Sequence, residues 1–370
     1  MNAESGGRLL ALDVMRGGTM AMMILVNMAI SPALSWGQLL HSVWDGFTLA
    51  DAIYPTFLFV VGASMALSFG VPGRASPEWP RIWRRAAMLV ACGLFVSNFP
   101  FGHVDAGGHW IWQTWPQVRL PGVLQRIGLA YLLAAAALRA GGARAAWLYC
   151  AVMLPLSWLV ALHWGDFTLA GSAVLKVDLA VFGPGHLYHG ERRPFDPEGL
   201  LGSFPATVNL LAGYLVLRHL RLDHDRPQVL KQLMLAGLVL VAVALAWAQV
   251  LPINKKLWSA SYALLAIGVD SVLLALLVWF IDQHGWRKGL NLFEVIGRNP
   301  LALYMLAEAL MSVAWTVKVN GLSLFMVIFN TVFAGAVTGR IGSFAFGLAM
   351  VGLCWAIGGW MDRRRVYVRL

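Results

Sequence analysis

Charged residues are scarce in this 370-residue chain: they make up 12% of it, whereas hydrophobic residues make up 59%. Soluble domains usually carry about 25% charged residues, so this composition excludes an ordinary soluble enzyme. The mean hydropathy is +0.68, and apolar stretches of roughly 20 residues, the length that crosses a bilayer as a helix, recur from one end to the other. The sequence therefore predicts an all-α integral membrane protein that forms a single domain over residues 1–370.

Cysteine and the common catalytic motifs are also rare or missing. Cys92, Cys150 and Cys354 each lie in an apolar run without CxxC spacing, which favours core packing over a disulfide or a metal site. There is no GxSxG, P-loop or HExxH motif, so serine hydrolases, NTPases and zinc proteases have no motif support. His186 and His189 lack a neighbouring cysteine or carboxylate pattern, and we predict no metal site.

The formal charge of +10 does not indicate a nucleic-acid partner, because the basic residues form short clusters between apolar runs. We predict about ten transmembrane helices around a polar cavity, at residues 9–31, 47–70, 82–99, 121–138, 145–163, 199–218, 230–251, 257–281, 299–317 and 342–361. Arginine and lysine clusters follow the second, fourth, sixth and eighth spans, and the C-terminal "DRRRVYVRL" is basic. Positive loops stay on the cytoplasmic side, so both termini are predicted to be cytoplasmic and the number of crossings to be even.

Two further segments have a predicted place in this topology. The long connection 164–198 should face the outer side, where a loop of that length is more often functional than idle. The apolar stretch 322–338 would give an odd number of crossings if it spanned the membrane. We therefore expect it to form a re-entrant or interfacial helix on the outer side.

Six predicted spans each carry a polar group, which indicates a shared polar cavity, because charges inside spans survive mainly when they pair or line water. These residues are Asn27, Asp51, Arg126, Glu198, Asp270 and Glu308. Asp13 and Arg16 lie three apart at the inner start of the first span, so they share one helix face and can pair with each other.

Polar motifs gather at the predicted outer ends. "RLPGVLQR" at 119–126, "FDPEGLLG" at 195–202 and "LPINKKLW" at 251–258 each place a turn and a charge at a helix start, and helix N-termini with Lys or Arg attract anions. His41 precedes Asp45 and Asp51, and a histidine beside carboxylates at a cavity mouth is a candidate general base. The alternative interpretation is a water-facing loop histidine.

Five ordered motifs carry a resemblance. "RLLALDVMRGGTMAMMILVN", "HSVWDGFTLADAIYPTFLFVVGAS", "RLPGVLQRIGLAY", "FDPEGLLGS" and "LPINKKLWSASY" resemble the transmembrane acetyltransferase family typified by heparan-α-glucosaminide N-acetyltransferase, and more closely its short bacterial relatives. The resemblance covers about residues 8–310. It implies a membrane enzyme that moves acetyl from cytoplasmic acetyl-CoA to the amino group of a glucosamine-type sugar on the periplasmic side. It also favours a homodimer in the bacterial inner membrane, in contact with membrane lipid.

The family pattern places its active-site histidine at His41 and its first-span asparagine at Asn27. Where the human member has asparagine, this sequence has Asp45, a change beside the expected base. We assign the expected catalytic set to His41, Asn27, Asp45 and Asp51. We assign acetyl-CoA binding to Arg126, Arg119, Gln125, Lys255 and Asn254. We assign acceptor binding to Glu198, Asp196 and Trp44.

Two other function classes stay open at this point. One is an O-acyltransferase that modifies an envelope glycan or lipid, because the acceptor depends on outer-loop contacts. The other is an amino-sugar transporter that uses Asp270 and Glu308 as proton carriers, although the paired broken helices of transporters are not evident.

Overall fold

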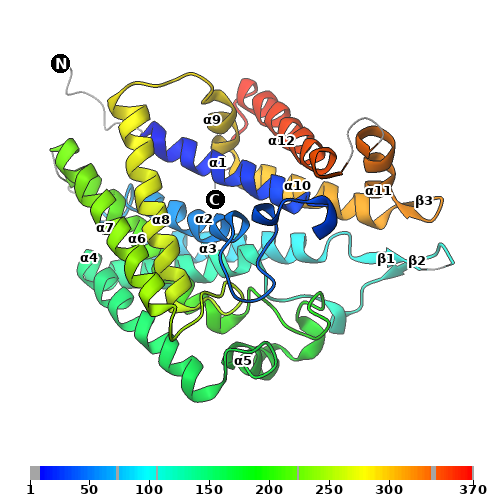
Figure 1. Ribbon diagram of the computed structural model, residues 1–370, viewed down its shortest axis with the longest axis horizontal. Coiled ribbons are helices and arrows are strands. Elements are labelled where there is room, and N and C mark those ends of the chain that lie inside the picture. The colour runs from blue at the N-terminus through cyan, green and yellow to red at the C-terminus, as the bar shows by residue number, and fades with distance from the viewer. Residues whose placement is uncertain (1–8, 72–74, 106, 223–224, 335–338, 369–370) are drawn as a thin grey trace.

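The computed structural model describes residues 9–71, 75–105, 107–222, 225–334 and 339–368, and the chain is mostly helical (Figure 1). The α-helices are α1 (Leu10–Asn27), α2 (Leu49–Met65), α3 (Trp79–Asn98), α4 (Val123–Trp164), α5 (Ala173–Phe182), α6 (Leu200–Leu222), α7 (Arg226–Trp247), α8 (Ala260–Leu277), α9 (Asn291–Arg298), α10 (Pro300–Thr316), α11 (Leu324–Ile328) and α12 (Gly339–Arg363). Shorter helical turns are η1 (Pro32–Leu34), η2 (Gly37–Leu39), η3 (Trp115–Gln117), η4 (Pro184–His186), and the π-helical η5 (Val278–Gln283) and η6 (Phe329–Ala334). Two antiparallel hairpins pair β1 (Gly102–Val104) with β2 (Trp110–Trp112) and β3 (Lys318–Val319) with β4 (Leu322–Ser323).

Each of the ten predicted spans coincides with a helical segment. The spans predicted at 121–138 and 145–163 are two arms of α4, whose backbone leaves helical geometry at Gly141 and Gly142. Gly142 has φ +58°, a left-handed conformation that glycine adopts without steric cost, and Figure 1 shows α4 changing direction there.

Within the described residues, six helices are long and apolar enough to cross a membrane: α1, α4, α6, α7, α8 with its continuation to Gln283, and α12. The chain is an integral membrane protein by this criterion, while the count of ten crossings stays a prediction. The segment predicted to be re-entrant forms α11 and η6, a ten-residue apolar helix to Phe333, and residues 335–338 lie outside the described part. This helix is shorter than the roughly 20 residues of a span, and its re-entrant or interfacial placement stays a prediction.

Glycines let several helices approach closely. A Cβ on Gly62 of α2 would lie 1.6 Å from the carbonyl oxygen of Leu210, and one on Gly213 of α6 would lie 1.9 Å from that of Phe59. Lipid offers no hydrophobic drive between helices, so close backbone contact at small residues is a main source of association. These two glycines fix the packing of α2, which leads into the predicted site, against α6.

The two ends of the described chain lie at the same end of the bundle. Asp282 in η5 accepts the backbone N–H groups of Leu10 and Ala11 at the start of α1. Asn299, which precedes α10, binds the tail: its Nδ2 donates to the carbonyl of Val366 at 3.0 Å and its Oδ1 accepts from the N–H of Val368 at 2.9 Å. Both ends therefore share one side of the bundle, as an even number of crossings requires. Their cytoplasmic location stays a prediction.

Candidate active site

A cavity of about 630 Å³ lies between α1, α2, α3 and α10, and residues of the connecting loops complete its lining. We call it the His41 cavity. Its volume is within the roughly 300–1,000 Å³ of small-molecule sites. The sequence-predicted residues that line it are Asn27, His41, Arg119, Glu198 and Lys255. The fold thus brings together residues that are as much as 228 positions apart in the sequence.

Asp51 orients the ring of His41. One carboxylate oxygen, Oδ1, lies 2.9 Å from His41 Nδ1, and the Asp51 side chain is 1% exposed. The other oxygen, Oδ2, accepts from the backbone N–H and the hydroxyl of Ser42 at 3.1 and 2.7 Å, and from those of Thr48 at 3.2 and 3.0 Å. Thr48 in turn caps α2 by accepting from the Asp51 N–H, so the carboxylate is part of a capping box. A carboxylate that accepts from Nδ1–H leaves Nε2 with its lone pair, which is the form of a general base.

Lys255 approaches His41 from the connection between α7 and α8. Its Nζ lies 3.1 Å from His41 Nδ1, 3.3 Å from Nε2 and 3.8 Å from Asp51 Oδ1. Burial lowers the pKa of Lys255, against the raising effect of Glu198 and Asp51. Lys255 therefore binds its proton less tightly than an exposed lysine does.

Asp45 helps to hold the loop that carries Lys255 in place. Its Oδ1 accepts from Asn254 Nδ2 at 3.0 Å, and the N–H of Gly46 donates to the carbonyl of Ile253 at 2.8 Å. Asn254 is fully buried, and its Oδ1 accepts from the N–H of Leu257. Asp45 and Asn254 thus fix the loop that carries Lys255, and neither lines the cavity.

A second charged cluster, around Arg119, also borders the cavity. Arg119 donates to both oxygens of Asp196 at 2.8 Å and to Glu198 at 2.7 Å, and its guanidinium lies 4.9 Å from the ring centre of Tyr188. Burial alone lowers the pKa of Arg119, but the hydrogen bonds and charges of Asp196 and Glu198 outweigh this and raise it above its ordinary value. Two carboxylates already neutralise this guanidinium, which makes it a poor phosphate ligand.

Asn27 lies at the end of α1 on another wall of the cavity, where its Nδ2 donates to Glu308 of α10 at 2.5 Å. Tyr54 and Tyr304 also line the cavity, and Tyr54 Oη donates to the carbonyl of Val123 at 3.0 Å. Neither tyrosine was predicted as a site residue, because aromatic side chains in apolar runs give no polar signal. Glu308 was predicted as an intramembrane charge but not as a neighbour of Asn27.

Three other residues with predicted binding roles lie behind the cavity walls. Arg126 is 2% exposed, donates to the carbonyl of Gly199 at 3.0 Å and lies 5.1 Å from the ring centre of Trp258. Gln125 donates to the carbonyl of Leu120 at 3.1 Å. Trp44 donates from its indole to the carbonyl of Phe167 at 2.7 Å. None of the three lines the His41 cavity, so any effect on a ligand there is indirect.

A second cavity, of about 800 Å³, continues along the same helices toward the end of the bundle that holds both chain ends. We call it the arginine cavity, after Arg16 of α1, Arg85 of α3 and Arg298 of α9. Arg16 pairs with Asp13 at 3.0 Å, which confirms the predicted ion pair, and also donates to Ser64 at 2.7 Å. In the described part of the chain, the buried Nε atoms of Arg85 and Arg298 have no hydrogen-bond partner.

The two cavities share no lining residue, but they approach each other at the level of Tyr54. Tyr54 and Val123 line the His41 cavity, whereas Phe57, one turn further along α2, and Leu124 of α4 line the arginine cavity. The hydrogen bond from Tyr54 to Val123 therefore lies at the boundary. Aliphatic and aromatic side chains line the arginine cavity next to this boundary: Phe57, Val60, Val61, Leu89, Leu124 and Ile127.

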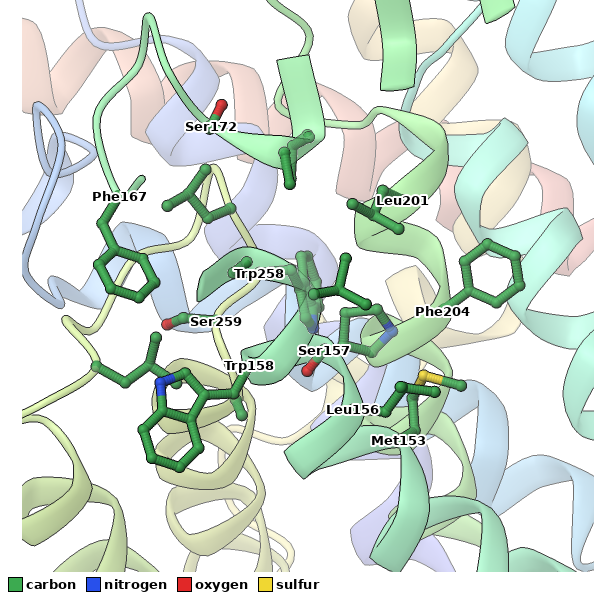
Figure 2. A pocket seen from close by; sticks show the side chains of 18 of the residues that line it. Met153, Leu156, Ser157, Trp158, Phe167, Ser172, Leu201, Phe204, Trp258 and Ser259 are labelled. Atoms are coloured by element: carbon green, nitrogen blue, oxygen red, sulfur yellow. The ribbon is translucent and has the colours of Figure 1, made fainter. Parts of the chain in front are cut away.

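A third, apolar pocket of about 260 Å³ lies on the other side of Trp258, between the second arm of α4, α5, α6 and the start of α8. Figure 2 shows its wall of Met153, Leu156, Phe204 and Leu201 with Trp158 and Phe167. It holds none of the predicted catalytic residues. Among the described residues, no three histidine, cysteine or carboxylate side chains come together as a metal site.

The chain is similar to known proteins over a region that includes Asn27, His41 and Asp51. A family model described as heparan-alpha-glucosaminide N-acetyltransferase, catalytic, matches residues 8–183, just under half of the chain. Heparan-alpha-glucosaminide N-acetyltransferase of Mus musculus is 24% identical over 83% of this chain and 54% of its own length, and that of Homo sapiens is 24% identical over 80% and 52%. The chain thus spans about half the length of these relatives. It is a distant relative of the heparan-alpha-glucosaminide N-acetyltransferases.

Proposed function

We propose that this protein is a membrane-embedded acetyltransferase. It takes acetyl from acetyl-CoA on the cytoplasmic side and delivers it to the amino group of a glucosamine-type sugar on the periplasmic side of a bacterial inner membrane. The observation that carries the proposal is the pairing of His41 with buried Asp51 at one cavity, with an arginine-lined cavity bounded by the next turns of α2 and α4. The similarity to N-acetyltransferases supports the reaction class.

The arginine cavity suits the coenzyme better than the residues predicted from the sequence. Phosphates need Arg or Lys donors that no carboxylate neutralises. Among the described residues, Arg85 has no carboxylate partner and retains a buried, unpartnered Nε atom, whereas Arg298 pairs with Asp362 and Glu294. The apolar side chains between these arginines and Tyr54 match an uncharged pantetheine arm. Arg119 is fully engaged by carboxylates, so we assign it to shaping the acceptor end instead.

His41 Nε2 is the proposed base. It removes a proton from the acceptor amine as the nitrogen attacks the thioester carbonyl; the C–N bond forms, the C–S bond breaks and the proton passes to the departing sulfur. Asp51 holds the Nδ1–H tautomer and balances the positive charge on the ring during transfer. The second N–H of the Asn27 amide, beyond the one bound by Glu308, is the proposed donor to the developing oxyanion.

Transfer of labelled acetyl from acetyl-CoA to glucosamine by the purified protein tests this function. We expect His41→Ala to keep the fold and to lose at least about 100-fold in turnover, the usual minimum for general acid–base catalysis. His163→Ala is the matched control, because His163 is exposed at the far end of α4. Full turnover in His41→Ala would exclude His41 as the base, and transfer only to hydroxyl acceptors would favour an O-acyltransferase.

A further inference from the structure

A fourth cavity, of about 620 Å³, opens directly beside the His41 cavity. We call it the amide vestibule. The two cavities share four lining residues, namely Ser97, Phe99, Ser312 and Thr316. The two cavities are therefore adjacent, and a molecule whose reacting end occupies the His41 cavity would reach the vestibule past these four residues.

The described residues that line the vestibule include no lysine, arginine, aspartate or glutamate. The lining consists of Ser97, Asn98, Phe99, Pro100, Gly102, His103, Gln113, Pro116, Gln117, Gly185, His189, Ser312 and Thr316. The neighbouring guanidinium of Arg119 is held by two carboxylates. Sulfate and carboxylate groups on a sugar need Arg or Lys donors, so this lining disfavours an anionic ligand.

Hydrogen bonds hold the side-chain amides of the vestibule in place and leave some of their donors and acceptors free for a ligand. Gln113 Nε2 donates to Asn98 Oδ1 at 3.0 Å and to the carbonyl of Gln117 at 2.6 Å, while no donor of the described chain reaches its Oε1. Gln117 uses its own Oε1 to accept from Thr114, which leaves its Nε2 for a ligand. Phe99 is half-buried at the shared boundary, stacked on Phe95. Amides beside an aromatic face suit a pyranose ring, which offers hydroxyls at its edge and apolar C–H groups on its face.

We propose that the amide vestibule binds the second sugar unit of the acceptor, and that this unit is uncharged. The inference rests on the proposed acetyltransferase function and narrows its acceptor to an oligosaccharide with a terminal glucosamine and a neutral neighbour. Gln113 and His189 then contact the second unit, and the fixed position of Gln113 lowers the entropy lost on binding.

Three acceptors of acetyl-CoA-dependent transfer test the proposal: glucosamine, glucosamine linked to N-acetylglucosamine, and the same disaccharide with a sulfate on its second unit. We expect kcat/KM to rise by about three- to tenfold from the monosaccharide to the neutral disaccharide, the effect of one or two hydrogen bonds. We expect the sulfated disaccharide to lose that gain.

Variants distinguish a loss of binding in the vestibule from a loss of folding or of catalysis. Gln113→Ala should raise KM for the neutral disaccharide by about three- to tenfold, with monosaccharide kinetics within twofold of the parent. His189→Ala, which removes an exposed ring without a hydrogen bond in the described structure, should do the same more weakly and cannot disturb the Asn98 contacts. Gln232→Ala, remote on α7, is the control.

The outcomes distinguish the two proposals. Transfer to glucosamine with no gain for the neutral disaccharide, equal use of the sulfated one, or no disaccharide effect of either variant would overturn the vestibule assignment alone. Absence of transfer to all three acceptors would overturn the proposed function itself.

Discussion

Replacing Asp51 by asparagine changes one atom in the network that orients His41. Oδ2 of Asp51 accepts four hydrogen bonds, from the N–H and hydroxyl groups of Ser42 and Thr48, whereas Oδ1 faces only His41 Nδ1 and, at 3.8 Å, Lys255. The amide oxygen of the new side chain must take the Oδ2 position, because an NH₂ group there would face four donors. The NH₂ group is therefore directed at His41 Nδ1.

An NH₂ donor at Nδ1 forces the proton of the neutral imidazole onto Nε2, the atom proposed to accept the proton of the amine. The same tautomer error in a serine protease costs about 10⁴-fold in kcat, and we expect a loss of roughly 10³- to 10⁴-fold here. Folding should be preserved, since the capping box of α2 keeps its acceptor oxygen.

Single-turnover transfer of labelled acetyl to glucosamine measures the effect, with thermal unfolding in detergent as the check on folding. Asp45→Asn is the matched control: its carboxylate accepts one hydrogen bond, from Asn254, that an amide oxygen can also accept, so we expect less than a threefold change. If Asp51→Asn retains a tenth or more of the parent turnover, the tautomer of His41 does not limit the reaction.

Three further variants test packing, charge and coenzyme binding. Gly62→Ala should lower the free energy of unfolding by about 1–3 kcal/mol in detergent denaturation, because its Cβ would overlap the carbonyl of Leu210, whereas Gly352→Ala has open space and should be neutral. Burial raises the pKa of Asp178 to about 7, so the free energy of unfolding of the parent should fall by on the order of 4 kcal/mol as pH rises from about 4 to about 7. Asp178→Asn should remove this pH dependence in unfolding measurements. Arg85→Gln should raise KM for acetyl-CoA by about tenfold or more without changing kcat, and an unchanged KM would exclude the arginine cavity as the coenzyme site.

The positions of the helices were predictable because apolar run length and glycine breaks dominate a membrane chain. Gly141 and Gly142, which the sequence left between two predicted spans, mark the turn within α4. The helix α5 inside the connection 164–198 was not predicted, since its ten residues fall short of a span and are preceded only by a single capping serine, Ser172.

The sequence predicted some of the residues that line the His41 cavity, but it did not predict their pairings. His41, Asn27 and Lys255 were expected at one end of the bundle, and they line one cavity. The partnership of His41 with Asp51 had a local signal in the Thr48-x-x-Asp51 capping pattern, which fixes the carboxylate at the helix start.

The arginine cavity had no comparable signal. Arg16, Arg85 and Arg298 come from three helices far apart in the sequence, and each fits the ordinary pattern of basic residues beside a span. In contrast, the sequence places Arg126 in a polar motif and predicts that it binds a ligand, whereas in the structure it is buried against Trp258. Only the packing of α3, α4 and α9 decides which guanidinium reaches a cavity.

The boundary between the two cavities at Tyr54 determines where the membrane voltage falls. If water enters the His41 cavity from one face and the arginine cavity from the other, the membrane voltage falls mainly across the short boundary where Tyr54 binds Val123. Each turnover would move acetyl outward as an acylium equivalent, because its bonding electrons stay on the sulfur, and a proton inward to the coenzyme thiol. These two movements cancel, so the acetylation of a neutral amine carries no net charge through the field. Only the additional proton of an ammonium acceptor, released on the inner side, would gain about 2.3 kcal/mol per 100 mV from a membrane that is negative inside.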